Sequence, residues 1–363
     1  MTLPSPLLDV KNLSVTRGGV EVLDIPSLAI HGGEVLTLIG PNGAGKSSLL
    51  LALACLIRAE HGSIIFKGRH VNADNGMLNY RRNITMVFQE PLLFDTTVFR
   101  NVAAGLKIRK VPGREIKGAA MAALARFGIG HLAGRDAKKL SGGEAQRASL
   151  ARAFALKPEI VFLDEPFSSL DPPTREALID DLHAILKETK TTTIMATHDI
   201  MEALRLSDRI AVMKDGRILQ IDSPDEVVNH PVDEFVASFV GMETILDGNV
   251  TGSEKGIMAV TVGTRVICAV GSLGGGEKVR CGIRPEQVIL SASSPEGDTS
   301  ARNTFESRIT KIVPLGLFYK VYLDCGFPMT AYVTQPSLEN LSLREGAAVF
   351  ASFKATAVHV IRR

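Results

Sequence analysis

The sequence predicts an α/β fold built on a mainly parallel sheet, followed by a small all-β domain. Up to about residue 240, apolar runs typical of buried strands alternate with helical patterns, and the clearest strands are 35–39, 160–163 and 192–197. Such alternation is typical of parallel sheets covered by helices. After Gly241, short strand-like runs rich in valine and threonine are separated by glycine-rich turns, which predicts a β domain over 241–363.

Two parts of the first domain, residues 1–240, are expected to differ from its central sheet. Residues 7–30 contain two strand-like runs joined by Gly18-Gly19, which is a hairpin signal, so we expect an antiparallel β layer there. Residues from about 92 to 139 hold few strand signals and one amphipathic stretch. This pattern predicts a helical subdomain inserted into the α/β domain.

The composition excludes some functional classes. The 363 residues suffice for two domains, and the net charge of +2 gives no long-range attraction to nucleic acid, so no such partner is expected. Four widely spaced cysteines predict reduced thiols in a cytosolic protein. No apolar run reaches the roughly 20 residues that span a bilayer, and the N-terminus shows no signal peptide. We therefore expect that a partner holds the protein at any membrane where it acts.

A phosphate-binding loop is predicted at residues 40–47, which fit the pattern G-x-x-x-x-G-K-S between a predicted strand and a predicted helix. The glycines allow backbone N–H groups to curl around phosphate oxygens, and the helix N-terminus adds partial positive charge. Lys46 is expected to reach the β- and γ-phosphates, and Ser47 to ligate Mg²⁺. The predicted nucleotide-binding residues are Gly40, Pro41, Asn42, Gly43, Ala44, Gly45, Lys46, Ser47 and Ser48.

Two carboxylates follow the apolar run 160–163. Because this strand is apolar at every position, we expect it to be buried, and ligand sites of α/β folds lie at the carboxyl ends of such strands. Asp164 is therefore predicted to hold Mg²⁺, and Glu165 to polarise the water that attacks the γ-phosphate. Phosphoryl transfer needs mainly positioning and charge stabilisation, which these two groups would supply.

The segment 140–147, with the sequence LSGGEAQR, predicts a helix start with an unusual composition. Ser141 and Glu144 are spaced as in a capping box. A cap does not explain Gly142 and Gly143, since glycine costs about 1 kcal/mol relative to alanine inside a helix. Two glycines are explained if this helix start must closely approach a phosphate.

Together, the phosphate loop, the strand end and the segment 140–147 resemble the motifs of ATP-binding cassette (ABC) ATPases, over residues 1 to about 240. The resemblance implies ATP and Mg²⁺ as cofactors. It also implies that Gln89 is the Q-loop residue, which contacts Mg²⁺ and water, that residues 169–171 form the D-loop, and that His198 contacts the γ-phosphate. One position departs from the family: Arg17 stands where many members carry an aromatic that stacks on adenine, so the choice between ATP and GTP stays open.

The resemblance further implies a homodimer in which Lys46 and Glu165 of one chain face Ser141 and Gly143 of the other. It implies integral-membrane permease subunits as partners, a substrate-binding protein as an indirect partner, and a location on the cytoplasmic face of the plasma membrane. Apolar residues after Gln89 are expected to dock the permease; the alternative is that they pack the helical subdomain. They are Leu92, Leu93, Phe94 and Val98.

The second domain also carries a resemblance. Residues 279–286 resemble the regulatory TOBE domain of bacterial import ATPases, an OB-like β fold, and 300–361 resemble the molybdate/tungstate-binding Mop module, which starts here with SARN and ends with SFKATAV. A tetrahedral dianion needs cationic and hydroxyl donors. The candidate oxyanion-binding residues are Ser300, Arg302, Lys354 and Thr356. The alternative is that these groups are simply solvated at a sheet edge.

These resemblances imply the ATP-hydrolysing subunit of a bacterial ABC importer for an oxyanion, with tungstate or molybdate as the first expectation. An importer of sulfate, iron, polyamine or sugar is the alternative. A soluble, non-transport ABC ATPase is a remoter one, because it would be expected to show a second cassette or long coiled coils. An oxyanion-sensing transcription regulator would need a helix-turn-helix and a basic face.

Overall fold

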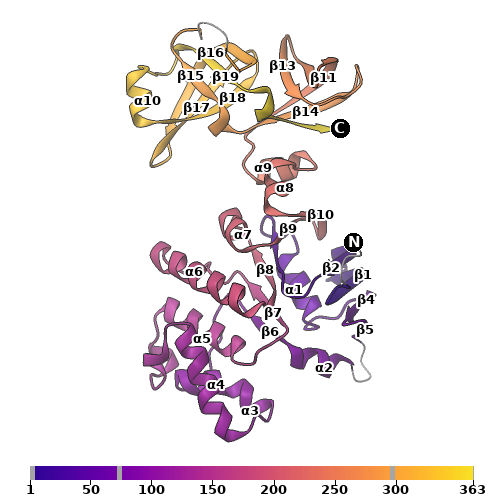
Figure 1. Ribbon diagram of the computed structural model, residues 1–363, viewed down its shortest axis with the longest axis vertical. Coiled ribbons are helices and arrows are strands. Elements are labelled where there is room, and N and C mark those ends of the chain that lie inside the picture. The colour runs from indigo at the N-terminus through magenta and orange to yellow at the C-terminus, as the bar shows by residue number, and fades with distance from the viewer. Residues whose placement is uncertain (1–4, 72–75, 295–298, 363) are drawn as a thin grey trace. The chain divides into compact units, whose positions relative to one another are not determined.

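The computed structural model describes residues 5–71, 76–294 and 299–362. The chain forms two compact units, Met1–Pro224 and Asp225–Arg363 (Figure 1). The first combines two sheets with most of the helices, and the second consists largely of β-strands. This confirms the predicted fold class, an α/β domain followed by a β domain.

An antiparallel layer forms the beginning of the first unit, as its hairpin signal predicts. Its strands β1 (Leu8–Arg17) and β2 (Val20–Ile30) pair antiparallel on either side of Gly18 and Gly19, both of which have positive φ angles. The sheet order is β2-β1-β4-β5, with β4 at His61–Phe66 and β5 at Arg69–His70.

The central sheet has six strands in the order β10-β9-β3-β8-β7-β6. Five of them are paired in parallel and β10 is antiparallel to β9. The strands β3 and β8 are buried along their whole length, which explains their continuous apolar runs. Their bounds are β3 (Val35–Ile39), β6 (Ile84–Val87), β7 (Ile160–Asp164), β8 (Thr192–Thr197), β9 (Arg209–Lys214) and β10 (Arg217–Asp222).

Helices α3 and α4 form the predicted helical subdomain, and α5 packs against both of them. Its core includes Phe127 and Phe154, whose ring centroids lie 5.6 Å apart. Val98, one of the apolar residues after Gln89, is fully buried in this core. The helices of the first unit are α1 (Lys46–Leu53), α2 (Gly76–Asn83), α3 (Val98–Ile108), α4 (Gly113–Arg126), α5 (Gly142–Phe154), α6 (Pro172–Thr189) and α7 (Ile200–Leu206).

The second unit has two five-stranded antiparallel sheets, in the orders β13-β12-β11-β14-β20 and β15-β19-β16-β17-β18. Alternating inward-facing side chains of both sheets form one apolar core. The strands are β11 (Thr244–Glu254), β12 (Ile257–Val262), β13 (Arg265–Val270), β14 (Lys278–Ile283), β15 (Ile289–Ser291), β16 (Asn303–Pro314), β17 (Phe318–Asp324), β18 (Pro328–Thr334), β19 (Ala348–Phe353) and β20 (Val358–Arg362). Helix α10 (Gln335–Asn340) comes directly after β18.

The compact units divide at Pro224/Asp225, earlier than the boundary of 240/241 expected from composition. Two short helices, α8 (Pro224–Asn229) and α9 (Glu234–Phe239), account for the difference. The Arg284 guanidinium donates to the carbonyls of Val228 and Val240, both at 2.7 Å. Side-chain hydrogen bonds that cross between distant segments therefore hold these helices to the β unit, and composition does not reveal them.

Asn303 joins the two sheets of the second unit. Its side chain is almost fully buried, its Oδ1 accepts a hydrogen bond from the Cys268 N–H at 2.7 Å, and its Nδ2 donates to the Cys268 carbonyl at 2.9 Å. Asn303 begins β16, whereas Cys268 lies in β13 at the edge of the other sheet. This amide pairs with the backbone as a neighbouring strand would.

We predict that Asn303→Leu destabilises the second unit, because it preserves volume but leaves both backbone groups of Cys268 unpaired, at a cost of about 2 kcal/mol. Differential scanning calorimetry of the full chain should show the melting of this unit lowered by about 5 °C or more. Glu306→Gln, an exposed change on the same strand, is the matched control. Equal melting temperatures for the two variants would contradict the role of Asn303.

Candidate functional site

The phosphate loop connects β3 to α1 and depends on glycine at two points. Gly40 has a φ of +153°, and a Cβ there would lie 2.3 Å from the Met213 carbonyl oxygen, so a larger residue does not fit. Gly45 has a φ of +97° and precedes the first residue of α1, Lys46. These two positions let the loop turn tightly and direct its N–H groups and the helix N-terminus to one side.

The loop lines a cavity of about 740 Å³, a size typical of small-molecule sites. Gln89, Glu165 and His198 line the same cavity, although they lie far apart in the sequence. The structure thus brings together residues predicted from four separate segments of the sequence. The loop residues that line it are Asn42, Gly43, Ala44, Gly45, Lys46, Ser47 and Ser48.

Lys46 is a buried cation at the base of this cavity. Its Nζ donates to the carbonyl oxygens of Gly40 at 2.7 Å and Pro41 at 3.1 Å. Burial lowers the pKa of the Lys46 ammonium, and the nearby carboxylates Glu165 and Asp164 oppose this shift. The ammonium is thereby held inside the loop, where it can act as a point charge toward phosphate oxygens.

Ser47 and Asp164 form an oxygen pair beside Lys46. The Ser47 hydroxyl donates to Oδ1 of Asp164 at 2.8 Å. Burial raises the pKa of the Asp164 carboxyl, while the Ser47 hydrogen bond and Lys46 oppose the rise. Hydroxyl and carboxylate oxygens are suitable Mg²⁺ ligands. Among the described residues no cluster of three or more His, Cys, Asp or Glu could hold a metal by itself.

Glu165 and His198 face each other across the ends of β7 and β8. Nδ1 of His198 lies 2.7 Å from Oε2 of Glu165. The Glu165 backbone has a φ of +47°, unusual for a residue with a side chain, and its N–H donates to the Ala196 carbonyl at 2.9 Å. Such strain is typical of functional positions. The carboxylate therefore lies between a strand end and an imidazole.

The helix start at 141–143 is not among the described residues that line this cavity. Ser141 begins α5 with a complete capping box: its N–H donates to Glu144 Oε2 at 2.7 Å, and its hydroxyl accepts from the Glu144 N–H. A Cβ on Gly143 would lie 2.5 Å from the methyl group of Thr174 in α6. Packing against α6 therefore also requires a glycine here, a reason that the sequence did not reveal.

Arg17 is exposed at the end of β1 and is not among the described residues that line the cavity. The rim on this side comes from the start of β2 and from the turn between β9 and β10, and its residues are Val20, Glu21, Val22, Asp215 and Gly216. Sequence reasoning missed all five. Asp215-Gly216 is a hairpin-turn signal, but it carries no indication that the turn borders a nucleotide site.

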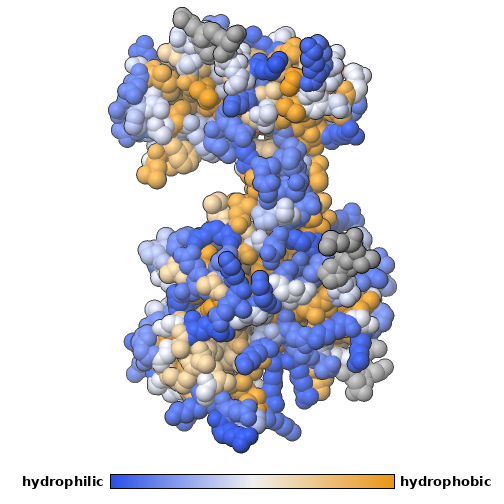
Figure 2. Space-filling view, in the orientation of Figure 1, coloured by the Kyte–Doolittle hydropathy of each residue, from blue (hydrophilic) through white to orange (hydrophobic). Residues whose placement is uncertain are grey.

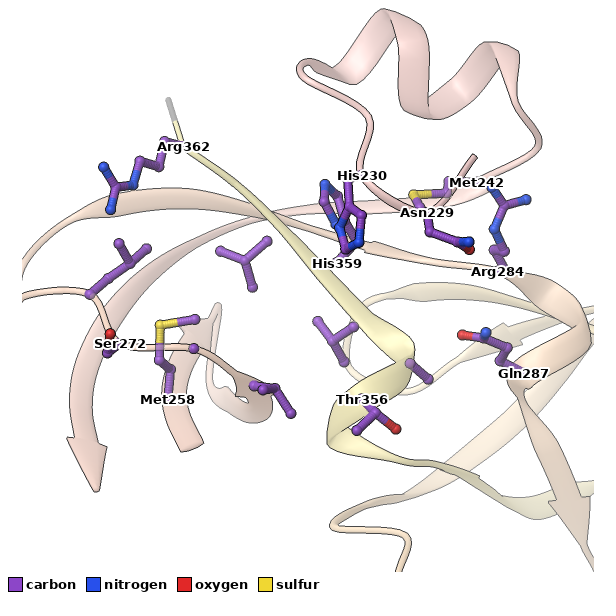
Figure 3. Close-up of a pocket in the computed structure, with 16 residues that line it drawn as sticks. Asn229, His230, Met242, Met258, Ser272, Arg284, Gln287, Thr356, His359 and Arg362 are labelled. Carbon is purple, nitrogen blue, oxygen red and sulfur yellow. The ribbon is translucent and has the colours of Figure 1, made fainter. Parts of the chain in front are cut away.

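The four residues predicted to bind an oxyanion are distributed over more than one place. Asn303 pairs with Phe353, so the neighbouring residues Arg302 and Lys354 lie at the same end of the β16–β19 ladder. Thr356 instead lines a separate cavity of about 600 Å³ within the second unit, together with His230 and His359 (Figure 3). Ser300, Arg302 and Lys354 are not among the described residues lining that cavity.

Exposed apolar side chains come after Gln89 on the surface of the first unit. Leu92 and Phe94 are 57% and 55% exposed, whereas Leu93 packs against the helical core. Figure 2 shows the hydropathy of one face of the molecule. Within the described part of the chain, no helix is both long enough and apolar enough to cross a membrane.

Comparison with known proteins agrees with these motifs. The ABC transporter family matches residues 23–168, and the TOBE domain family matches residues 299–360. The molybdate/tungstate import ATP-binding protein WtpC of Pyrococcus horikoshii is 37% identical over 356 residues, which cover 98% of this chain and 99% of the relative. The sulfate/thiosulfate import ATP-binding protein CysA of Mycolicibacterium paratuberculosis is 35% identical, covering 94% of this chain and 88% of the relative.

A solved structure shows the same fold for the first part of the chain. The cbiO1 protein of Clostridium perfringens, described as part of the ABC transporter complex cbiONQ, matches with a TM-score of 0.59 and 31% identity, covering 66% of this chain and 96% of that one. The near full-length relatives, the two matched families and the assembled nucleotide cavity agree with one another. The chain belongs to the ABC transporter family of ATPases and carries a C-terminal TOBE domain.

Proposed function

We propose that this protein is the ATP-hydrolysing subunit of an ABC importer for tungstate or molybdate. The observation that supports ATP hydrolysis is one cavity lined by Lys46, Ser47, Gln89, Glu165 and His198. The cargo rests on the near full-length likeness to the WtpC proteins of Pyrococcus horikoshii and Pyrococcus abyssi, at 37% and 36% identity. Import of sulfate is the second candidate, because the CysA relatives are almost as similar.

Each residue of the cavity has a role in this proposal. The Lys46 ammonium and the N–H groups of the loop bind the phosphates of ATP. Ser47, Asp164 and Gln89 hold Mg²⁺, which neutralises charge on the phosphates. Glu165 orients the attacking water and accepts its proton, and His198 fixes the Glu165 carboxylate and contacts the γ-phosphate. Arg17 remains a proposed partner for the base, by stacking of its guanidinium.

We propose further that the active unit is a homodimer. The capped start of α5 consists of Ser141, Gly142 and Gly143 and presents backbone N–H groups. These residues are not among the described residues that line the cavity of their own chain. A helix N-terminus favours anions. In the proposed dimer, this helix start of one chain therefore closes over the γ-phosphate bound by the other.

The proposed permease contact lies after Gln89. The Arg152 guanidinium lies over the Phe94 ring, with its Cζ atom 5.7 Å from the ring centroid. Arg152 also donates a hydrogen bond to the Leu92 carbonyl at 2.9 Å. These contacts anchor the segment in which Leu92 and Phe94 are exposed, and exposed apolar side chains are what a docking surface requires. Val98 belongs to the core and is not part of it. Binding there would keep the protein on the cytoplasmic face of the membrane, with the substrate-binding protein reached only through the permease.

The four oxyanion candidates in the second unit keep a proposed regulatory role. Arg302 and Lys354 supply two cations at one end of a strand pair, with Ser300 close by in sequence. Intracellular tungstate or molybdate bound there would act as a brake on transport. Such coupling requires that the ion bind the inactive arrangement of the protein more tightly than the active one. Thr356 would join only if its side chain reaches the same ion.

Glu165→Gln should abolish turnover and keep ATP binding, because it preserves shape and removes the charge that orients water. We predict a hydrolysis rate at least about 10²-fold lower, measured by phosphate release. Glu188→Gln, a change of an exposed glutamate on α6, is the matched control and should hydrolyse normally. In cells, tungstate accumulation measured by mass spectrometry should fall with Glu165→Gln. If sulfate uptake alone falls, the tungstate proposal is wrong and the sulfate alternative holds.

Mixing two inactive variants should restore part of the activity if sites are shared. Lys46→Ala disables the phosphate loop of the chain that carries it. Gly143→Asp disables the helix start that its chain contributes to the site of the partner chain. In a mixed dimer, one site carries both changes and the other carries neither, so an equal mixture should recover about a quarter of wild-type turnover.

The Gly143→Asp protein alone needs a folding control, since a Cβ at this position would lie 2.5 Å from the Thr174 methyl group. It should still bind ATP in equilibrium titration, because its own loop is intact. Full hydrolysis by this single variant would refute the shared-site proposal.

Isothermal titration of the full chain tests the proposed brake. Tungstate and molybdate should bind, and Lys354→Gln should weaken both by about tenfold, which corresponds to about 1.4 kcal/mol. Lys311→Gln, an exposed change on β16, is the control and should bind as the wild type does. No heat with tungstate, molybdate or sulfate would remove the proposed brake and leave the importer proposal in place.

A further inference from the structure

The two residues that flank His198 are fixed by side-chain hydrogen bonds. Thr197 ends β8 and is buried; its Oγ1 accepts from the Asp199 N–H at 3.1 Å. Asp199 caps α7, and its Oδ1 accepts from the Met201 N–H at 2.8 Å. The backbone on both sides of His198 is therefore held, whereas the His198 side chain itself is more than half exposed.

Glu202, in the first turn of α7, completes this arrangement. The Thr197 hydroxyl donates to Glu202 Oε2 at 2.5 Å. Glu202 is only 4% exposed and is not among the described residues lining the nucleotide cavity. Burial raises the pKa of the Glu202 carboxyl, and the Thr197 hydrogen bond opposes the rise. Burying a carboxyl is costly, so its retention beside a candidate catalytic histidine calls for a specific reason.

Arg175 approaches the same group from α6. Its Nη1 donates to Asp199 Oδ2 at 3.2 Å, and its Nε lies 3.9 Å from Glu202 Oε1. This Nε is buried and has no hydrogen-bond partner among the described residues. Arg175 thus faces both carboxylates of α7 from the helix next to the D-loop residues 169–171, whose last member, Asp171, caps α6.

We propose that Glu202 is a positioning residue for His198. Through Thr197 it fixes the end of β8, and the position of the His198 ring relative to Glu165 depends on that strand end. Arg175 connects the same carboxylate to α6, so a shift at the start of α6 would be felt at His198. The inference rests on the proposed role of His198 in hydrolysis. Glu202 itself touches neither water nor nucleotide in this proposal.

A double-mutant cycle tests the proposal. Glu202→Leu keeps volume but loses the acceptor for Thr197, and it should lower kcat at least about tenfold, because small displacements of catalytic groups are costly. The KM for ATP should change by less than about threefold. Glu202→Gln retains an acceptor oxygen and should restore most of kcat. In a His198→Ala background, Glu202→Leu should lower the single-turnover rate by less than about twofold, since the group it positions is gone.

Two further variants make the cycle robust. Thr197→Val removes the hydroxyl that donates to Glu202 and accepts from the Asp199 N–H, and it should repeat the loss if Glu202→Leu fails to fold. Glu176→Gln is the control, because Glu176 is an exposed glutamate on α6 that pairs with Arg205, and kcat should be unchanged.

The outcomes separate this inference from the proposal on which it rests. Equal losses from Glu202→Leu with and without His198 would overturn the positioning role, as would an unchanged kcat in both Glu202→Leu and Thr197→Val. If His198→Ala itself hydrolyses ATP at the wild-type rate, the proposed role of His198 fails instead.

Discussion

The parallel pairing of β3, β8 and β7 is the constraint on which the nucleotide site depends. In this register Ile39 lies beside Thr197, and Asp164 lies beside Ala196. Three strands consequently end at one edge of the sheet, and the residues after each strand contribute a different group: the phosphate loop after β3, Glu165 after β7 and His198 after β8. A shift of one residue between β7 and β8 would separate the imidazole from the carboxylate it contacts at 2.7 Å, and a shift between β3 and β8 would move the phosphate loop relative to both groups.

Burial gives this edge its chemistry. Lys46, Asp164 and Glu165 lie close enough to influence one another, and the loss of hydration is the largest effect on both Lys46 and Asp164. A lysine that is easier to deprotonate and a carboxyl that is easier to protonate are both destabilised as charges. Polyphosphate and a divalent ion would restore the charge balance that burial disturbs. A second free-energy cost at this edge is the left-handed backbone conformation of Glu165, whose N–H is hydrogen-bonded to the Ala196 carbonyl.

Much of this site could be predicted because its motifs are contiguous. The loop 40–47, the strand end at Asp164 and Glu165, and the helix start at Ser141 each specify a local geometry from a few neighbouring residues. The central sheet and the hairpin around Gly18 were likewise predictable from apolar periodicity and turn residues. Residues whose role depends on distant contacts were not. Asp215 lies at the cavity because of where β9 and β10 stand in the sheet order. A side chain at Gly143 would clash with Thr174, which lies on another helix.

The Arg284 side chain has a consequence for how the second unit can be separated from the first. Its guanidinium, mostly buried, is satisfied by the carbonyls of Val228 and Val240, and the ring of His359 is hydrogen-bonded to the Pro231 carbonyl at 3.0 Å. A fragment beginning at Gly241 would leave an arginine that cannot deprotonate without acceptors in an apolar setting. A folding unit that contains the TOBE domain therefore includes α8 and α9, so residues 225–240 are part of its tertiary structure and not a spacer.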